Sequence, residues 1–150
     1  MKRSQRMNVV LQMAEREEQD SVAWLSQCRE TLQAAEDQLA QMIDYEKTFA
    51  LEIKEMGAQG VHPQRYQRYQ LFYSQLKEAQ AAFQGNIRQC EAAVEMALKG
   101  WQALHARRLN IEDLIERLCK EENDLLEKKL QQEMDELAQL AYQRQQSNNC

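Results

Sequence analysis

The sequence predicts an all-α protein, a long antiparallel two-helix coiled-coil hairpin whose second helix is longer than the first. Three observations lead to this prediction. The 150 residues include four glycines and one proline, so the chain has few residues with which to turn, and strands need turns. Ala, Leu, Glu, Gln, Lys and Arg recur with helical spacing, which is typical of long helices. Apolar heptads run on both sides of a single interruption, KEMGAQGVHPQRY at residues 54–66.

The first helix is predicted over about residues 5–56. Its a positions are mostly apolar, with interruptions at Glu18 and Glu46, and its d positions include Cys28, Met42 and Phe49. A seam of this length, with few helix breakers, predicts one continuous helix that packs along a partner.

The turn is predicted over residues 57–62. Gly57 suits the left-handed residue that ends a helix, Gly60 permits a second unusual backbone angle, and Pro63 suits the first turn of the next helix. A lone histidine before a proline, His62, is a weak candidate for a metal or catalytic role. The segment is therefore interpreted as a corner, not as a site or an interdomain linker.

The second helix is predicted over about residues 63–144. Its d series is apolar from Tyr69 to Leu125, and beyond Leu125 the apolar positions shift by one residue, as in a stutter. Gly85 and Gly100 inside the helix each cost about 1 kcal/mol relative to Ala, and a close approach of the helices is one interpretation. Residues 145–150 are predicted to form a tail after the helix, and the polar composition of its last four residues, SNNC (147–150), suggests disorder. Residues 1–150 are expected to form one coiled-coil domain.

Two helices joined by a short loop are expected to pack antiparallel. Pairing residues across the turn places Phe49 near Phe72, and Cys28 within about one helical turn of Cys90. The g positions of both helices then lie on one side. There, Tyr45 and Phe72 are expected to form an apolar patch beside Met42, Phe49, Leu76 and Phe83. The patch is either a widened core or a partner-binding strip.

The unequal helix lengths predict an uncovered helix end. The first helix is expected to run out opposite about residue 115, by the spacing of paired residues in an antiparallel hairpin. Six apolar residues would then lack a partner within the hairpin: Leu118, Leu125, Leu126, Leu130, Met134 and Leu137. Because a single helix with an uncovered apolar stripe is marginal in water, this end must fray, dimerise or enter another protein.

Several functional classes are disfavoured. The net charge of −5 argues against nucleic acid as the main partner. The four cysteines have no close spacing, so no zinc site is expected. No apolar run approaches the ~20 residues of a membrane span, and no signal peptide is evident, so the default location is the cytoplasm. No catalytic arrangement or phosphate loop is present, so neither an enzyme nor a cofactor is expected.

Six stretches of the chain, in order, resemble the flagellar FliJ export protein family: LQMAEREEQDSVAWL (11–25), AAEDQLAQMIDYEKTF (34–49), MGAQGV (56–61), RYQRYQLFYSQLKEA (65–79), VEMALKGWQ (94–102) and EMDELAQLA (133–141). Heptads alone do not require the MIDY before the turn, the glycine-containing turn or ALKGW. These features therefore carry more of the resemblance than the coiled-coil pattern does.

The resemblance implies a soluble component of the flagellar type III export apparatus, similar to the stalk subunit of rotary ATPases. Its termini end would enter the hexameric ring of the export ATPase FliI and stimulate it. The protein would also contact the export gate FlhA and assist the recycling of export chaperones. It would be monomeric alone and cytoplasmic, peripheral to the inner membrane at the flagellar base through its partners.

Two sets of contact residues are expected, the first carried over from the resemblance and the second taken from the helix ends that the stalk similarity would place in the ring. The set for the gate is a near-turn strip: Gln38, Met42, Tyr45, Phe49, Phe72, Leu76, Ala79 and Phe83. The set for the ATPase lies at the helix ends: Val10, Leu118, Leu125, Leu126, Leu130, Met134 and Leu137. The equivalent stalk of a virulence injectisome and a generic dimerising coiled coil are the alternatives.

Overall fold

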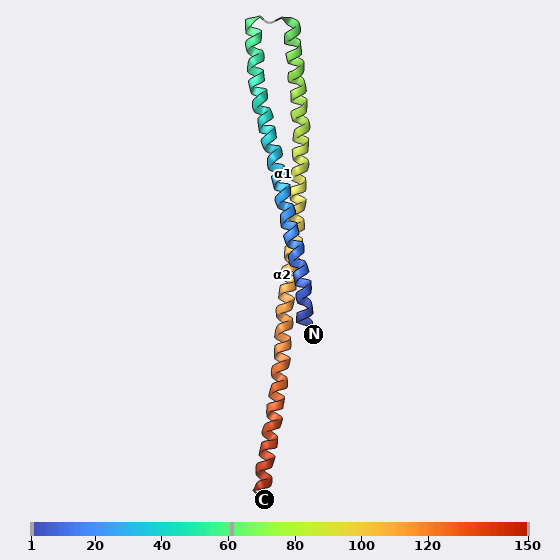
Figure 1. Cartoon of the computed structure of the whole chain (residues 1–150), viewed down its shortest axis with the longest axis vertical. Helices are drawn as coiled ribbons and strands as arrows, with labels where there is room; N and C mark the ends of the chain where they lie inside the picture. Colours follow the sequence, from blue (N-terminus) through green and yellow to red (C-terminus); the bar gives the residue numbers. More distant parts are fainter. Residues whose placement is uncertain (1, 61, 150) are drawn as a thin grey trace. The chain divides into compact units, whose positions relative to one another are not determined.

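The computed structural model describes residues 2–60 and 62–149. Two α-helices contain nearly all of them, α1 over Arg3–Gln59 and α2 over Pro63–Asn148 (Figure 1). No strand occurs within these described ranges. The predicted all-α class, with a second helix longer than the first, is confirmed.

The first helix ends later than predicted. Gly57 lies inside α1, and Gly60 is the glycine with a positive φ, at 77°. The prediction that Gly57 ends the helix in the left-handed conformation was wrong, because Ala58 and Gln59 extend the helix and the left-handed residue is needed only after them. Val61, part of the predicted turn, lies outside the described residues.

The second helix begins at Pro63, as predicted, and His62 caps it. The His62 carbonyl accepts hydrogen bonds from the backbone N–H groups of Arg65 and Tyr66, at 3.0 and 3.2 Å. Its ring Nδ1 accepts one from the Gln64 N–H at 3.3 Å. These bonds satisfy donors that are otherwise unpaired at a helix start. His62 therefore has a structural role in the turn.

The far end of α2 is also longer than predicted. The predicted helix end near residue 144 and the expected disorder from residue 147 were wrong as far as Asn148, because the helix continues through that residue. The Asn149 N–H also donates to the Gln145 carbonyl at 3.2 Å. The residues before it, AYQRQQ, are mostly good helix formers, so a polar composition alone does not end the helix. Cys150 lies outside the described residues.

The chain divides into two packed units. Residues 19–103 form the turn unit, in which α1 and α2 run antiparallel on either side of the loop (Figure 1). Residues 2–18 and 104–149 form the termini unit.

The turn unit has a small core that confirms the hairpin pairing. Leu25, Cys28 and Ala97 are buried together, with Val94 and Leu98 packed against them. Cys28 and Cys90 line one groove of about 180 Å³, and both thiols are free. The predicted proximity of these two cysteines is therefore confirmed. Gly85 and Gly100 do not mark a close approach of the helices, since an added Cβ at either position would meet no atom within 4 Å.

The termini unit covers α2 further than the sequence predicted. The Ser4 N–H and hydroxyl donate to the Glu122 carboxylate at 3.1 and 2.7 Å. Leu118 is 7% exposed, so the prediction that it lacks a partner in the hairpin was wrong. The prediction assumed one constant pairing register from the turn onward, whereas Ser4 takes a partner beyond residue 115. From residue 123 to 149 every residue is exposed, and α2 continues past the start of α1 (Figure 1).

Candidate partner-binding surfaces

The near-turn strip lies entirely in the turn unit and is part core, part surface. Phe49 is buried at 7% exposed, and Met42, Leu76 and Phe83 are half-buried. The exposed members of the strip are Gln38, Tyr45, Phe72 and Ala79. The strip therefore widens the core, as one reading expected, and it leaves an apolar face in solvent, which the partner-binding reading requires.

Phe49 holds the exposed rings of the strip in place. Its ring centroid lies 6.3 Å from that of Tyr45, nearly parallel, and 5.0 Å from that of Phe72, edge to face. Tyr69 contacts the same ring at 5.7 Å. Such pairs add about 0.5–1.5 kcal/mol beyond their area burial. Tyr45 and Phe72, at 53% and 43% exposed, are therefore presented on a rigid support, which lowers the entropy lost when a partner binds.

Sequence reasoning missed a groove beside this strip. Phe49, Tyr69 and Phe72 line it together with Arg65 and Arg68, and its volume is about 380 Å³. The arginines were passed over because the heptad analysis looked for apolar residues. The available signal was that Arg65 shares the g row with Phe72, seven residues further on.

A partly buried polar cluster lies in the same unit as the strip, with Glu46 and Gln80 as its buried members. The Glu46 carboxylate accepts hydrogen bonds from the Tyr73 hydroxyl at 2.9 Å and from the Gln80 amide at 3.1 Å, and it pairs with the Lys77 ammonium at 2.6 Å. Lys77 first, then Gln80 and Tyr73, lower the pKa of Glu46 from 4.5 to about 2. Polar groups at a positions of a coiled coil fix the register of its helices, and this cluster has that geometry.

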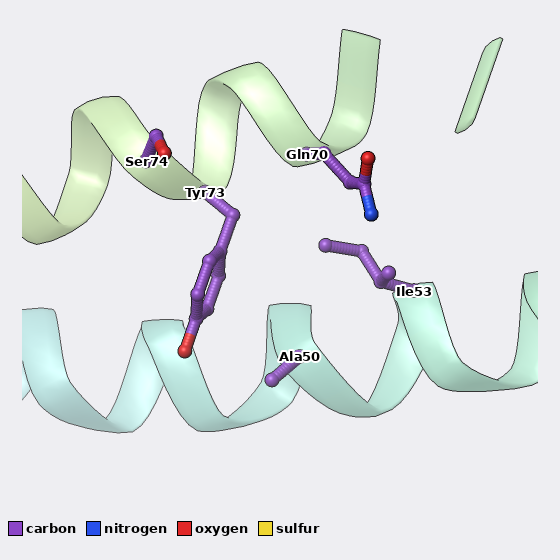
Figure 2. A pocket seen from close by; sticks show the side chains of 5 residues that line it. All are labelled: Ala50, Ile53, Gln70, Tyr73 and Ser74. Carbon is purple, nitrogen blue, oxygen red and sulfur yellow. The ribbon is translucent and has the colours of Figure 1, made fainter. Parts of the chain in front are cut away.

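A second groove lies on the loop side of this cluster, with a volume of about 490 Å³ and a lining of Ala50, Ile53, Gln70, Tyr73 and Ser74. Figure 2 shows Tyr73 reaching from α2 to α1, while the Gln70 amide and the Ile53 side chain approach each other across the gap. Among the described residues, no group of three or more His, Cys, Asp or Glu side chains is placed to hold a metal ion.

Acid is expected to weaken the turn unit through Glu46. Because its pKa falls from 4.5 to about 2 on folding, the stabilisation is complete above pH 4.5 and is lost as the pH falls toward 2. Thermal midpoints measured by circular dichroism from pH 7 to pH 2 should fall more steeply for the wild type than for Glu46→Gln. Glu55→Gln, which changes an exposed carboxylate of α1, is the control and should follow the wild-type curve. Parallel curves for the wild type and Glu46→Gln would contradict this role.

The termini unit is closed by charged contacts. Glu18 pairs with Arg108 and with His105 Nδ1, the latter at 2.8 Å, and Arg108 also pairs with Glu112 at 2.7 Å. Hydrogen bonds from Arg108 and then His105 lower the pKa of the Glu18 carboxyl. Because these charged groups pair with one another, we interpret them as contacts that hold the two helices together and not as a binding site.

The overhang, defined as residues 123–148 of α2, is the second candidate surface. Five predicted contact residues lie on it and all are exposed: Leu125, Leu126, Leu130, Met134 and Leu137. Leu140 and Tyr142 are exposed as well and were missed, because the sequence analysis followed a single stripe. Of the other two predicted ATPase contacts, Val10 is half-buried and Leu118 is covered. Over the described ranges, neither helix has a stretch sufficiently long and apolar to span a membrane.

The fold and these surfaces define a two-helix coiled-coil protein whose candidate sites are surfaces for other proteins. The sequence profile described as "Flagellar FliJ protein" matches residues 2–147. The flagellar FliJ protein of Escherichia coli strain K12 is 31% identical over 136 residues, covering 88% of this chain and 90% of that protein. The flagellar FliJ protein of Salmonella typhi is 30% identical with the same coverage. No solved structure matches significantly. The chain belongs to the flagellar FliJ family, which makes it a component of the flagellar export apparatus.

Proposed function

We propose that this protein links the export ATPase FliI to the export gate FlhA and assists the recycling of export chaperones. The observation that carries the proposal is the presence of two exposed apolar surfaces, the overhang in one unit and the solvent-facing part of the near-turn strip in the other. Contiguous exposed apolar surface is typical of protein interfaces. The family match favours a flagellar system over the injectisome alternative.

The overhang is the surface proposed for the ATPase. It is a helix of roughly 40 Å, at 1.5 Å per residue, and seven large apolar residues are exposed along it. Entry into the central cavity of a hexameric ring would cover such a helix on all sides. By binding the assembled ring better than separate subunits, the protein would raise the hexamer population and with it ATP turnover. This role requires no chemistry from the chain itself.

The near-turn strip is the surface proposed for the gate. Tyr45 from α1 and Phe72 from α2 supply large, rigid and partly exposed rings, which is the composition expected of an interface hot spot. Binding at this strip would bring the protein to the cytoplasmic face of the inner membrane through the gate. The free protein is expected to be a monomer, and a dimer in light scattering at micromolar concentration would favour the generic coiled-coil alternative.

The test of the gate surface is the double variant Tyr45→Ala and Phe72→Ala. We expect it to bind the cytoplasmic domain of the gate at least 30-fold more weakly, because loss of a hot-spot side chain costs about 1–2 kcal/mol or more. Isothermal titration calorimetry measures the affinity, and ATPase stimulation should remain. The matched control is Leu51→Ala with Leu71→Ala, which removes two exposed apolar side chains of the same unit from the outer f positions. Equal gate affinity for both double variants would refute the assignment.

A further inference from the structure

The groove lined by Arg65, Arg68, Tyr69, Phe49 and Phe72, called here the arginine groove, combines an aromatic floor with a basic rim. Phe49 is buried and Tyr69 half-buried, so the floor is anchored in the coiled-coil core. Arg65 and Arg68 are exposed, and the Arg65 guanidinium carbon lies 5.9 Å from the centroid of the Tyr69 ring. This contact stabilises Arg65 over the aromatic surface.

The two guanidinium groups at the rim have no carboxylate partner in the described part of the chain. None of the ion pairs found there involves Arg65 or Arg68. In the termini unit, by contrast, Arg107 pairs with Glu17 at 3.2 Å across the same g rows. The corresponding carboxylate near the turn is Glu52, which forms no such pair with Arg65. The protein has a net charge of −5. Two positive charges without a carboxylate partner, beside aromatic side chains, are therefore suited to binding a negatively charged group.

We propose that the arginine groove binds an acidic segment of a protein partner, one that inserts an aromatic or long aliphatic side chain between the arginines. A guanidinium group binds a carboxylate through two parallel hydrogen bonds, and the rings below accept an apolar anchor. The proposal rests on the proposed function, because Phe49 and Phe72 belong to the near-turn strip as well. It adds the prediction that the gate surface in contact with the strip is acidic and carries an apolar anchor residue.

An acidic protein segment fits the groove better than nucleic acid does. Binding to a phosphate backbone draws its affinity from many basic contacts along an extended surface, whereas the groove has two arginines. Its volume of about 380 Å³ is at the small end of ligand pockets, which suits the side chain of a single anchor residue. A protein segment with carboxylates on both sides of such an anchor would pair with the two arginines and place the anchor against the aromatic rings.

The test uses the full chain and the cytoplasmic domain of the gate, with affinities measured by calorimetry at 50 and 500 mM NaCl. Arg65→Gln with Arg68→Gln should weaken binding at least tenfold at 50 mM NaCl and reduce its dependence on salt, because two charge contacts are lost. Arg65→Lys with Arg68→Lys keeps the charge and should recover part of the affinity. The matched control, Arg29→Gln with Arg88→Gln, removes two exposed arginines of the same unit and should bind within twofold of the wild type.

Failure of this inference is distinguishable from failure of the proposed function. If Arg65→Gln with Arg68→Gln binds like the wild type while Tyr45→Ala with Phe72→Ala does not, the inference is overturned and the gate assignment stands. If the wild type does not bind the gate at all, the gate assignment fails. In that case a fluorescent peptide with one Trp flanked by Asp and Glu is the probe, compared with the same peptide carrying Lys. Acid-selective binding that the double Gln variant loses supports the groove, and its absence overturns it.

Discussion

Replacing the apolar residues of the overhang is expected to abolish the proposed stimulation of the export ATPase. The variant Leu126→Gln, Leu130→Gln and Leu137→Gln keeps the helix, since Gln and Leu have similar helix propensities, but it removes the apolar stripe. All three residues are at least half exposed, so the hairpin loses little packing energy. Each lost leucine removes about 1.5–3 kcal/mol of burial in a complex that encloses it. ATP turnover of the purified export ATPase should therefore stay at its unstimulated rate when this variant is added.

Two measurements separate this effect from misfolding. The triple variant should have the wild-type helix content and should bind the gate with wild-type affinity, because the near-turn strip belongs to the other unit. The matched control, Lys128→Gln with Glu136→Gln, alters exposed charged residues of the same overhang and should stimulate as the wild type does. Full stimulation by the triple leucine variant would show that the ATPase recognises another part of the chain.

The heptad pattern was sufficient to predict the fold because the core of a coiled coil depends on spacing. Apolar residues at a and d predicted both helices and the pairing that places the Phe49 and Phe72 ring centroids 5.0 Å apart. The helix end was not predicted, because Gly57 and Gly60 satisfy the same local rule for a left-handed terminal residue. The conformation of Gly60 depends on how far the helix propagates before the loop, and a local rule does not contain that information.

The polar residues of the seam were the harder part of the prediction. Glu18 and Glu46 interrupt the apolar pattern. When one helix is considered without its partner, nothing indicates what these two side chains contact. In the structure, Glu46 meets Gln80, Tyr73 and Lys77, whereas Glu18 meets Arg108 and His105. Such complementarity is visible only once the register is known, and small shifts of register change every pair. The floor of the arginine groove also depends on the register, since it joins Phe49 of α1 to Tyr69 and Phe72 of α2.

Replacing Leu118 is expected to open the termini unit, whereas replacing Leu125 is not. Leu118 is 7% exposed and Leu125 is 66% exposed, although both are d positions of one apolar series. Truncation of a buried leucine to alanine costs about 2–5 kcal/mol, and surface changes usually stay within about 0.5 kcal/mol. Leu118→Ala should therefore accelerate amide hydrogen exchange in residues 3–18 by roughly 30-fold or more, because less packing holds that segment on α2.

Hydrogen exchange of Leu125→Ala provides the control, and residues 3–18 should exchange at the wild-type rate in that variant. The comparison locates the point where α1 stops covering α2, because only residues before that point support the segment. Glu122, hydrogen-bonded to Ser4, lies between the two leucines. If both variants accelerate exchange equally, residues 3–18 must also cover Leu125, and the uncovered surface offered to a partner begins later. If neither does, the segment is held by its polar contacts alone, and the apolar stripe available to a partner extends back past Leu118.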